Sequence, residues 1–140
     1  DDIHVTRFRN NLFDVVSMSH VLEHSWNPKV VMREVYRILK PEGLVFIEVP
    51  LERFTTNSLD SAHLQFWENK HDVFRYISPL FEILFHAVAD NGHVKFCVII
   101  AKKLKFVEEA PVSFGSYKEF NVTDEQYQLY REKLMKRGQL

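Results

Sequence analysis

Two short apolar runs flank an amphipathic segment in the first third of the chain. They cover residues 13–18 and 44–49, and Pro50 ends the second. Each run has the length of a strand and is almost continuously apolar, which is typical of a parallel sheet covered by helices. We therefore expect two neighbouring strands that are buried on both faces.

The segment between the two runs carries the signals of a helix. Asn27 is suited to cap its first turn and Pro28 fits the first helical position. Pro41-Glu42-Gly43 then breaks the helix and turns the chain. The apolar stripe consists of Val31, Val35, Ile38 and Leu39, whereas Lys29, Arg33, Glu34 and Arg37 are expected to face elsewhere.

A strand, a helix and a second strand in this order predict a right-handed βαβ unit. Ligands of such sheets bind beyond the carboxyl ends of the strands. In this chain those ends lie at residues 17–20 and 48–51. Any small-molecule site is therefore expected there.

The rest of the chain continues the sheet. A polar loop over residues 51–64 precedes a helix over about residues 68–77, and Asp90-Asn91-Gly92 is a hairpin signal between two further apolar runs. We expect four strands near residues 12–18, 44–49, 80–88 and 94–102. Residues 103–120 are irregular in pattern, and Thr123 with Gln126 predicts a capping box that opens a last helix.

Three pieces in order, FDVVSMSHVLEH, RILKPEG and LVFIEVP, resemble the second half of a class I S-adenosylmethionine-dependent methyltransferase. The resemblance implies a three-layer Rossmann-like α/β fold with a mixed sheet and an antiparallel C-terminal hairpin. Residues 1–103 would be a partial methyltransferase domain, comprising strands 4 to 7 of the family fold, and residues 104–140 an irregular segment and a C-terminal helix. The implied sheet order is first, second, fourth, third.

The family's glycine-rich cofactor loop has no counterpart in this sequence. The four glycines lie far apart and form no G-x-G element, and residue 1 is Asp. The resemblance therefore implies that the first strands and helices lie upstream and that this chain is a fragment. We expect the chain alone to bind S-adenosylmethionine weakly or not at all.

The resemblance also implies cofactor-binding residues. Asp2 and Ile3 match the position where the family contacts the adenine ring, although an exposed acidic N-terminus explains them equally well. Ser19 and His20 follow the first strand and are expected to line the pocket, where His20 is also a candidate catalytic residue. Glu23 and His24 are expected to fix the turn by hydrogen bonds.

His20, Glu23 and His24 also form H-x-x-E-H, the spacing of an inverted zinc-peptidase motif. Two His four residues apart share one face of a helix and can share a zinc ion. Here the motif directly follows a strand and precedes the next helix by only three residues. We therefore disfavour a zinc-dependent hydrolase and expect no metal ligands.

His63 begins an H-x-x-F pattern that resembles the segment before the next helix in some of these enzymes. An imidazole is a suitable general base at neutral pH, so His63 is a candidate catalytic residue. The alternative, slightly favoured, is a His that only hydrogen-bonds the preceding loop.

Composition narrows the classes of partner. Hydrophobic residues make up 46% of the 140 residues and the net charge is −1, so a packed core is expected and nucleic acid or an anionic membrane is not. The single cysteine, Cys97, allows no internal disulfide, and no signal peptide or membrane-spanning run is present. These features favour the cytoplasm.

The leading hypothesis is the substrate-side half of a methyltransferase that acts, with S-adenosylmethionine in the complete protein, on a small molecule. The alternative is a non-catalytic remnant of the fold that works by association. If no upstream strand covers residues 13–18, this strand is a bare edge, and such edges pair with other chains. The edge could be covered by a second copy, be covered by the tail segment folded back over it, or cause aggregation. We expect the homodimer, to which the stripe Tyr127, Tyr130 and Leu134 would contribute.

Overall fold

The computed structural model describes residues 2–55, 58 and 62–107. The elements in chain order are β1 (Phe13–Ser19), a 3₁₀ turn η1 (Leu22–His24), α1 (Pro28–Ile38), β2 (Leu39–Leu51), α2 (Lys70–Ile77), β3 (Phe81–Asp90) and β4 (Lys95–Lys103). The expected last helix, with its Tyr127–Leu134 stripe, lies outside the described residues.

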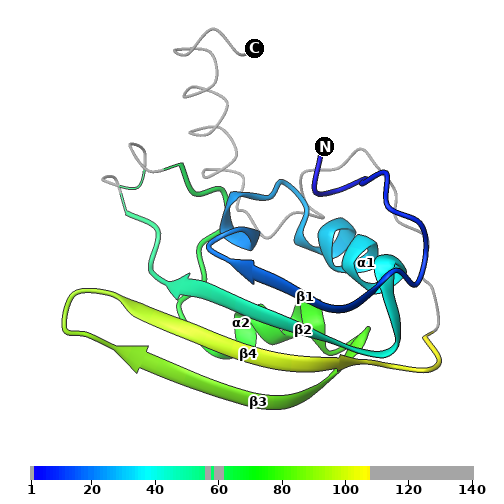
Figure 1. The fold of residues 1–140 in the computed structure, drawn as a ribbon. Helices are drawn as coiled ribbons and strands as arrows, with labels where there is room; N and C mark the ends of the chain where they lie inside the picture. The colour runs from blue at the N-terminus through cyan, green and yellow to red at the C-terminus, as the bar shows by residue number, and fades with distance from the viewer. Residues whose placement is uncertain (1, 56–57, 59–61, 108–140) are drawn as a thin grey trace, which may run out of the picture.

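The strands form one mixed sheet in the order β1-β2-β4-β3 (Figure 1). β1 and β2 are parallel, and β4 runs antiparallel to both β2 and β3. At the β3–β4 turn the Asn91 side chain accepts bonds from the backbone N–H groups of His93 and Val94, and Gly92 has a φ of 84°. The predicted βαβ unit, hairpin and strand order are confirmed.

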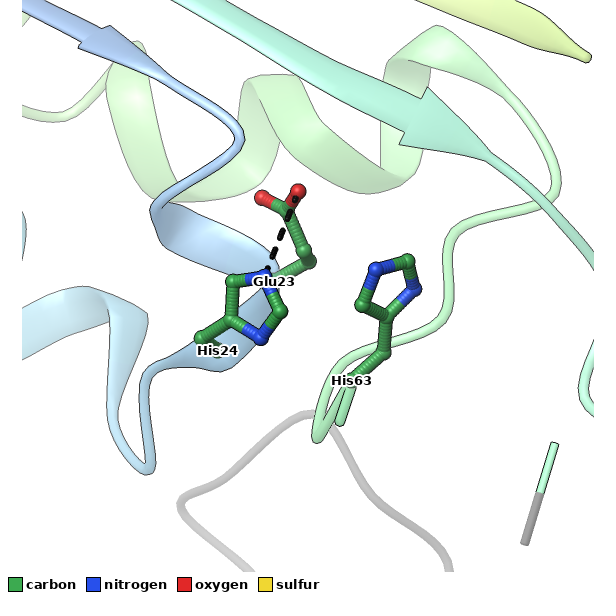
Figure 2. Close-up of side chains that lie close together, drawn as sticks. All are labelled: Glu23, His24 and His63. Carbon is green, nitrogen blue, oxygen red and sulfur yellow. Dashed lines mark ion pairs between the residues drawn. The ribbon is translucent and has the colours of Figure 1, made fainter. Parts of the chain in front are cut away.

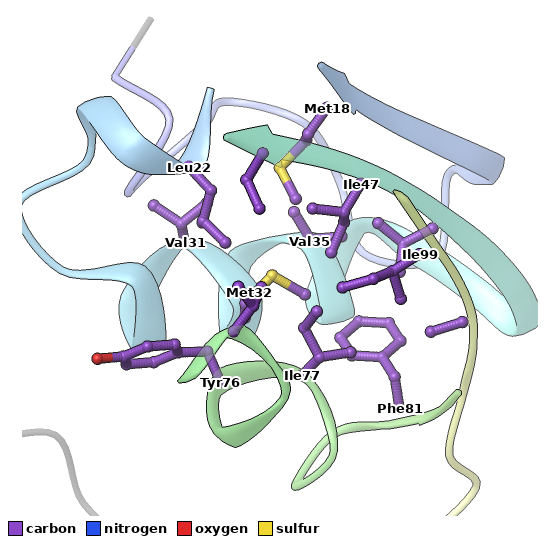
Figure 3. Packing of buried hydrophobic residues seen from close by; sticks show 14 of the residues in the cluster. Met18, Leu22, Val31, Met32, Val35, Ile47, Tyr76, Ile77, Phe81 and Ile99 are labelled. Carbon is purple, nitrogen blue, oxygen red and sulfur yellow. The ribbon is translucent and has the colours of Figure 1, made fainter. Parts of the chain in front are cut away.

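Both helices pack on the same face of the sheet. Figure 3 shows side chains of α1 and α2 in one cluster with strand residues such as Ile47 and Ile99. The described residues thus give two of the three expected layers. Along β2 and β4 buried residues alternate with half-buried ones, and on β1 the side chain of Val15 is 57% exposed. The expectation of burial on both faces is therefore wrong for β1 and β2.

β1 is the edge strand of the sheet within the described residues. The expected homodimer requires β1 to be at the edge of the sheet, as it is here. The homodimer itself stays a prediction. No helix among the described residues is long and apolar enough to cross a membrane.

α1 begins as predicted and ends earlier. The Asn27 side chain accepts a bond from the N–H of Val30, and Pro28 opens the helix. At the other end the N–H groups of Asn11 and Leu12 donate to the carbonyls of Arg37 and Ile38. Carbonyls of the last helical turn have no partner inside the helix, so the segment before β1 supplies the missing donors.

Lys103 joins the end of β4 to the C-terminal end of α1 and to the segment before β1. Its ammonium donates to the carbonyl of Leu39 at 2.7 Å and to the side chain of Asn11 at 3.0 Å, and it lies 4.4 Å from the centre of the Tyr36 ring. Burial lowers the pKa of Lys103. These contacts compensate for the burial of the ammonium group. The C-terminus of α1 adds a further favourable interaction, because a cation there meets the negative end of the helix dipole.

The predicted turn at residues 41–43 lies inside the bounds of β2. Phe13 pairs with Leu39 and Val15 with Leu44, so two steps along β1 match five along β2. Leu39 is therefore a strand residue and not the last residue of the helical stripe. Glu42 takes a φ of 64° in this bulge.

Glu34 faces away from the apolar stripe of α1, as predicted, and is nevertheless buried. Its carboxylate accepts bonds from the backbone N–H and the hydroxyl of Thr6 at 2.8 and 2.5 Å, and from the Arg37 guanidinium at 2.5 and 2.8 Å. The segment before β1 therefore covers this face of the helix. The bond from Arg37, followed by those from Thr6, lowers the pKa of Glu34 to about 2 despite its burial.

Gly43→Ala should destabilise the bulge of β2. A methyl group at this position would lie 2.8 Å from the Lys40 carbonyl oxygen and 3.2 Å from that of Asp14. Both atoms belong to the backbone, so relief requires a shift of the strand. We expect the free energy of unfolding to fall by about 1–3 kcal/mol in urea titration. A Gly43→Ala variant as stable as the parent would contradict the bulge geometry.

Stability should depend on Glu34 in a defined pH window. The folded pKa of about 2 lies below the ordinary 4.5, so the ionised carboxylate stabilises the fold above pH 4.5 and loses this effect as the pH falls toward 2. Glu34→Gln should lower the free energy of unfolding at neutral pH by on the order of 2 kcal/mol, and the difference should shrink in acid. Urea titrations across this range measure it.

Glu82→Gln is the matched control. Glu82 is exposed on β3 and lies 3.5 Å from Lys102. Exposed ion pairs contribute about 0–1 kcal/mol, so this variant should stay close to the parent at every pH. A pH-independent difference for Glu34→Gln would show that the Arg37 and Thr6 contacts are not responsible.

Candidate functional site

The carboxyl ends of β1 and β2 lie side by side and end in polar residues. Ser19 pairs with Glu48 in the parallel ladder, and its hydroxyl donates to a Glu48 carboxylate oxygen at 3.3 Å. The backbone N–H of His20 donates to the Glu48 carbonyl at 3.0 Å. His20 then turns the chain away from the sheet with a φ of 52°.

The His20 ring lies between two carboxylates. Its Nδ1 is 3.1 Å from Glu23 Oε1 and its Nε2 is 3.2 Å from Glu48 Oε1. The ring of Phe96 on β4 packs against it edge to face. His20 therefore joins η1 to β2, and both ring nitrogens are used in doing so. Its predicted catalytic role stays a prediction.

Three hydrogen bonds hold the loop after β2 against η1. The backbone N–H groups of Leu64 and Gln65 both donate to the carbonyl of Glu23, at 2.7 and 2.9 Å. The buried Gln65 amide donates to the carbonyl of Ser25 at 2.9 Å. We refer to these three bonds as the 64–65 clamp. It places residue 63 next to residue 24 although 39 positions separate them in sequence.

His24 and His63 meet at this point. Their ring centres are 4.9 Å apart, and Figure 2 shows both side chains beside Glu23. His24 Nδ1 is 3.1 Å from the carbonyl oxygen of Ala62. His63 Nδ1 contacts a carboxylate oxygen of Glu52, just beyond β2. That contact agrees with a His that bonds the preceding loop, and the general-base role of His63 stays a prediction.

Glu23 supplies the buried charge of the site. Its side chain is fully buried, and Oε1 is 3.1 Å from His20 Nδ1 and 3.9 Å from His24 Nε2. Glu23 Oε2 is buried without a hydrogen-bond partner among the described residues. Glu23 and His24 therefore hold the turn by hydrogen bonds as expected, through the Glu23 carboxylate to His20 and through His24 to Ala62, while Glu23 Oε2 has no partner among the described residues.

The H-x-x-E-H segment does not form the helix that an inverted zinc-peptidase motif needs. η1 has three residues, and His20 precedes it with a left-handed backbone. Within the described residues the ligand atoms that lie within 4.8 Å of one another belong to Glu23, His24 and His63, and His20 is not in that group. The spacing argument for a zinc-dependent hydrolase requires a helix, so it does not apply to this segment.

Asp2 and Ile3 lie near the N-terminal end of α1. Asp2 Oδ1 accepts bonds from the backbone N–H of His4 at 2.9 Å and from the His4 ring at 2.7 Å, and these bonds lower the pKa of Asp2. The other ring nitrogen of His4 accepts a bond from the backbone N–H of Asn27. The N-terminal segment is thereby tied to the cap of the helix that follows the Ser19–His20 turn. Ile3 is half-buried and packs against the core.

A groove of about 780 Å³ runs along α1, from His4 and Lys29 at the start of the helix to its C-terminal end. It is lined by the segment before β1, by α1 and by the ends of α2 and β4, with Asn11, Tyr36, Arg37 and Lys103 among its residues. Ligands of parallel α/β sheets bind beyond the carboxyl ends of the strands, and Ser19, His20 and Glu48 do not line this groove. The groove is therefore not the expected cofactor site.

Sequence reasoning did not single out Glu48, Glu52 or Gln65. Glu48 and Glu52 stand at and just after the end of a predicted strand, a position that could have indicated them. Gln65 offered no signal, because its role depends on a contact with η1 that no local pattern shows.

More than half of the chain matches one known protein family. Residues 1–87 match the family described as methyltransferase domain. The chain belongs to this family. This family agrees with the resemblance of the three sequence pieces to methyltransferases. No curated protein sequence matches the chain.

Solved structures with the same fold are distant in sequence. The [4+2]-cyclase SpnF is 14% identical with a TM-score of 0.63, over 74% of this chain and 54% of that one. An S-adenosylmethionine-dependent methyltransferase from Methanosarcina mazei is 17% identical with a TM-score of 0.57, over 77% and 66%. The 1,6-didemethyltoxoflavin-N1-methyltransferase of Burkholderia thailandensis, solved with S-adenosylhomocysteine, is 13% identical with a TM-score of 0.58, over 72% and 48%. The chain thus matches about half to two thirds of these proteins' lengths, and at such identities they establish the fold alone.

Proposed function

We propose that the protein to which this chain belongs transfers a methyl group from S-adenosylmethionine to a small molecule. The chain would supply the acceptor side of the site. The observation that carries the proposal is the pairing of the carboxyl ends of β1 and β2, where Ser19, His20 and Glu48 come together. The family match adds the cofactor.

The described residues fit the adenine side of this cofactor. Both His4 contacts of Asp2 use Oδ1, so Oδ2 is available within the described residues to accept a bond from an exocyclic amino group. The side chain of Asp2 is 70% exposed, so a ligand can reach it. The methionine side requires close backbone approach, and the described glycines do not provide it: Gly43 lies in the β2 bulge and Gly92 in the hairpin.

The cofactor supplies an electrophilic sulfonium methyl group. The work of the chain is therefore to place the acceptor and exclude water, which accounts for most of the rate in such displacements. Ser19 and Glu48 would bind the polar part of the acceptor, and His20 would hold the Glu48 carboxylate in place through the 3.2 Å contact. Phe96 would support the His20 ring.

A small acceptor is favoured over a nucleic acid by the charge of the chain. The net charge is −1, and the polar groups at the strand ends include Glu23, Glu48 and Glu52. A carboxylate-rich edge repels phosphate backbones.

The competing function is a domain of this fold that does not transfer methyl groups. SpnF, with a TM-score of 0.63, is described as a [4+2]-cyclase, so proteins of this shape carry other chemistry. Here the edge strand β1 would instead serve association with another chain.

The test is methyl transfer by the natural full-length protein from isotope-labelled S-adenosylmethionine to a panel of small alcohols, phenols, amines and thiols. Calorimetry with S-adenosylmethionine and S-adenosylhomocysteine should show binding by that protein and weak or no binding by the 140-residue chain. Sub-micromolar binding by the 140-residue chain would show that the glycine-rich loop is dispensable. A full-length protein that binds neither compound would support the non-catalytic alternative.

In the full-length protein, Asp2→Ala should weaken S-adenosylhomocysteine binding by about 1–3 kcal/mol, or roughly 5- to 150-fold, for the loss of a hydrogen bond to the adenine. Asp14→Ala is the matched control, because Asp14 is an exposed carboxylate that pairs with Lys40 on the surface. Equal affinities for the Asp2 variant and the parent would remove Asp2 from the cofactor site.

A further inference from the structure

The cluster of Glu23, His24 and His63 has the composition of a metal site. One carboxylate oxygen and two ring nitrogens lie within 4.8 Å of one another, and in Figure 2 the three side chains converge from η1 and the loop after β2. These residues are fixed in place independently of any ligand, since the 64–65 clamp holds the two segments together.

The hydrogen bonds of the two rings define their tautomers. A carbonyl oxygen only accepts, so His24 Nδ1 must carry the proton that it shares with Ala62. The Glu52 carboxylate assigns the proton of His63 to Nδ1 in the same way. In a neutral imidazole the other nitrogen, Nε2, then carries a lone pair. Metal-binding histidines in proteins show this arrangement, in which the second ring nitrogen donates to a carbonyl or a carboxylate.

Glu23 provides the independent sign of a missing ligand. Its carboxylate is fully buried, and Oε2 has no hydrogen-bond partner among the described residues. Buried charges in proteins are paired or coordinate metals, because leaving them unsatisfied is costly. The contact from His20 reaches only Oε1, so it does not satisfy the second oxygen.

We propose that Glu23, His24 and His63 bind one divalent first-row transition-metal ion through a Glu23 carboxylate oxygen and the two Nε2 atoms. Glu23 Oε1 and His24 Nε2 are 3.9 Å apart and all three ligand atoms lie within 4.8 Å of one another, whereas ligands of a tetrahedral zinc site are separated by about 3.4 Å. Rotation of the side chains therefore has to bring the three atoms closer when the ion binds. Two imidazoles and one carboxylate suit ions such as Zn²⁺, Co²⁺ or Fe²⁺ better than Mg²⁺ or Ca²⁺.

Three protein ligands leave a coordination position open, which is typical of catalytic and not of structural metal sites. The site lies beyond the carboxyl ends of β1 and β2, beside His20. Coordination would use the Nε2 lone pair of His63, so it replaces the general-base role considered for this residue. The proposal does not depend on methyl transfer, because metal binding is measured on the chain itself.

The test is titration of the metal-free 140-residue chain with Co²⁺, followed by its visible d–d absorption, and competition with Zn²⁺. One equivalent of Co²⁺ should give the visible absorption of a Co²⁺ ion with a low coordination number. Zn²⁺ should displace the Co²⁺ and raise the melting temperature of the protein. Absence of both effects, or absorption only of the hexaaqua type, would overturn the proposal.

Variants separate this site from the other histidines. Glu23→Gln, His24→Gln and His63→Gln should each weaken binding by more than about 100-fold, and Glu52→Gln, which replaces the carboxylate behind His63 by a neutral amide, by about 10–100-fold. His93→Gln in the exposed hairpin is the matched control and should bind like the parent.

Circular dichroism should verify that each variant is folded. Because Glu52 would not touch the metal, the effect of Glu52→Gln should appear in affinity and not in stoichiometry. Undiminished binding in His24→Gln and His63→Gln, or loss in His93→Gln, would place the ion elsewhere and refute the assignment.

Discussion

The position of β2 in the middle of the sheet is the constraint on which the rest of this structure depends. Its backbone pairs with β1 on one side and β4 on the other, in opposite directions. Its buried residues Val45, Ile47 and Val49 form one face, and both helices must cover that face because apolar burial is the largest favourable term in folding. The carboxyl end of β2 also provides Glu48 and leads into Glu52, so the same strand positions the core and the site.

A second constraint concentrates chemistry at that end of the sheet. The chain leaves β1 through a left-handed His20 and a three-residue turn, which buries Glu23 under the loop after β2. The 64–65 clamp satisfies the Glu23 carbonyl twice and thereby fixes His63 beside His24. The relative position of His24 and His63 is therefore set by hydrogen bonds to the backbone carbonyls of Glu23 and Ser25.

Much of the fold followed from the sequence because its signals are local. Asn27-Pro28 sets the start of α1, the apolar runs define β1 and β2, and Asn91-Gly92 marks the hairpin. The strand order came from the family resemblance, since no local pattern shows that β4 lies between β2 and β3. Local signals failed where a distant segment intervenes: Glu34 is buried only because the chain before β1 folds over it and offers Thr6.

The candidate site was predictable in part for the same reason. The edge of the sheet and the residues Ser19 and His20 follow from topology, which fixes where parallel strands end. The neighbourhood of His63 does not, because Gln65 reaches Ser25 over 40 positions of sequence. The motif H-x-x-E-H indicated two of the three clustered residues and the wrong third, since the spacing argument assumes a helix that the turn does not form.

Buried charges at the two ends of the sheet differ in how completely they are satisfied. Near the amino ends, Lys103 has a carbonyl, an amide oxygen and an aromatic ring, and Glu34 has Arg37 and Thr6. Near the carboxyl ends, Glu23 is equally buried and one of its oxygens is unpartnered among the described residues. Native proteins leave few buried polar atoms unpaired, and those they leave call for an explanation. Complete pairing at one end indicates a structural role, and incomplete pairing at the end where ligands of this fold bind indicates a site for a ligand.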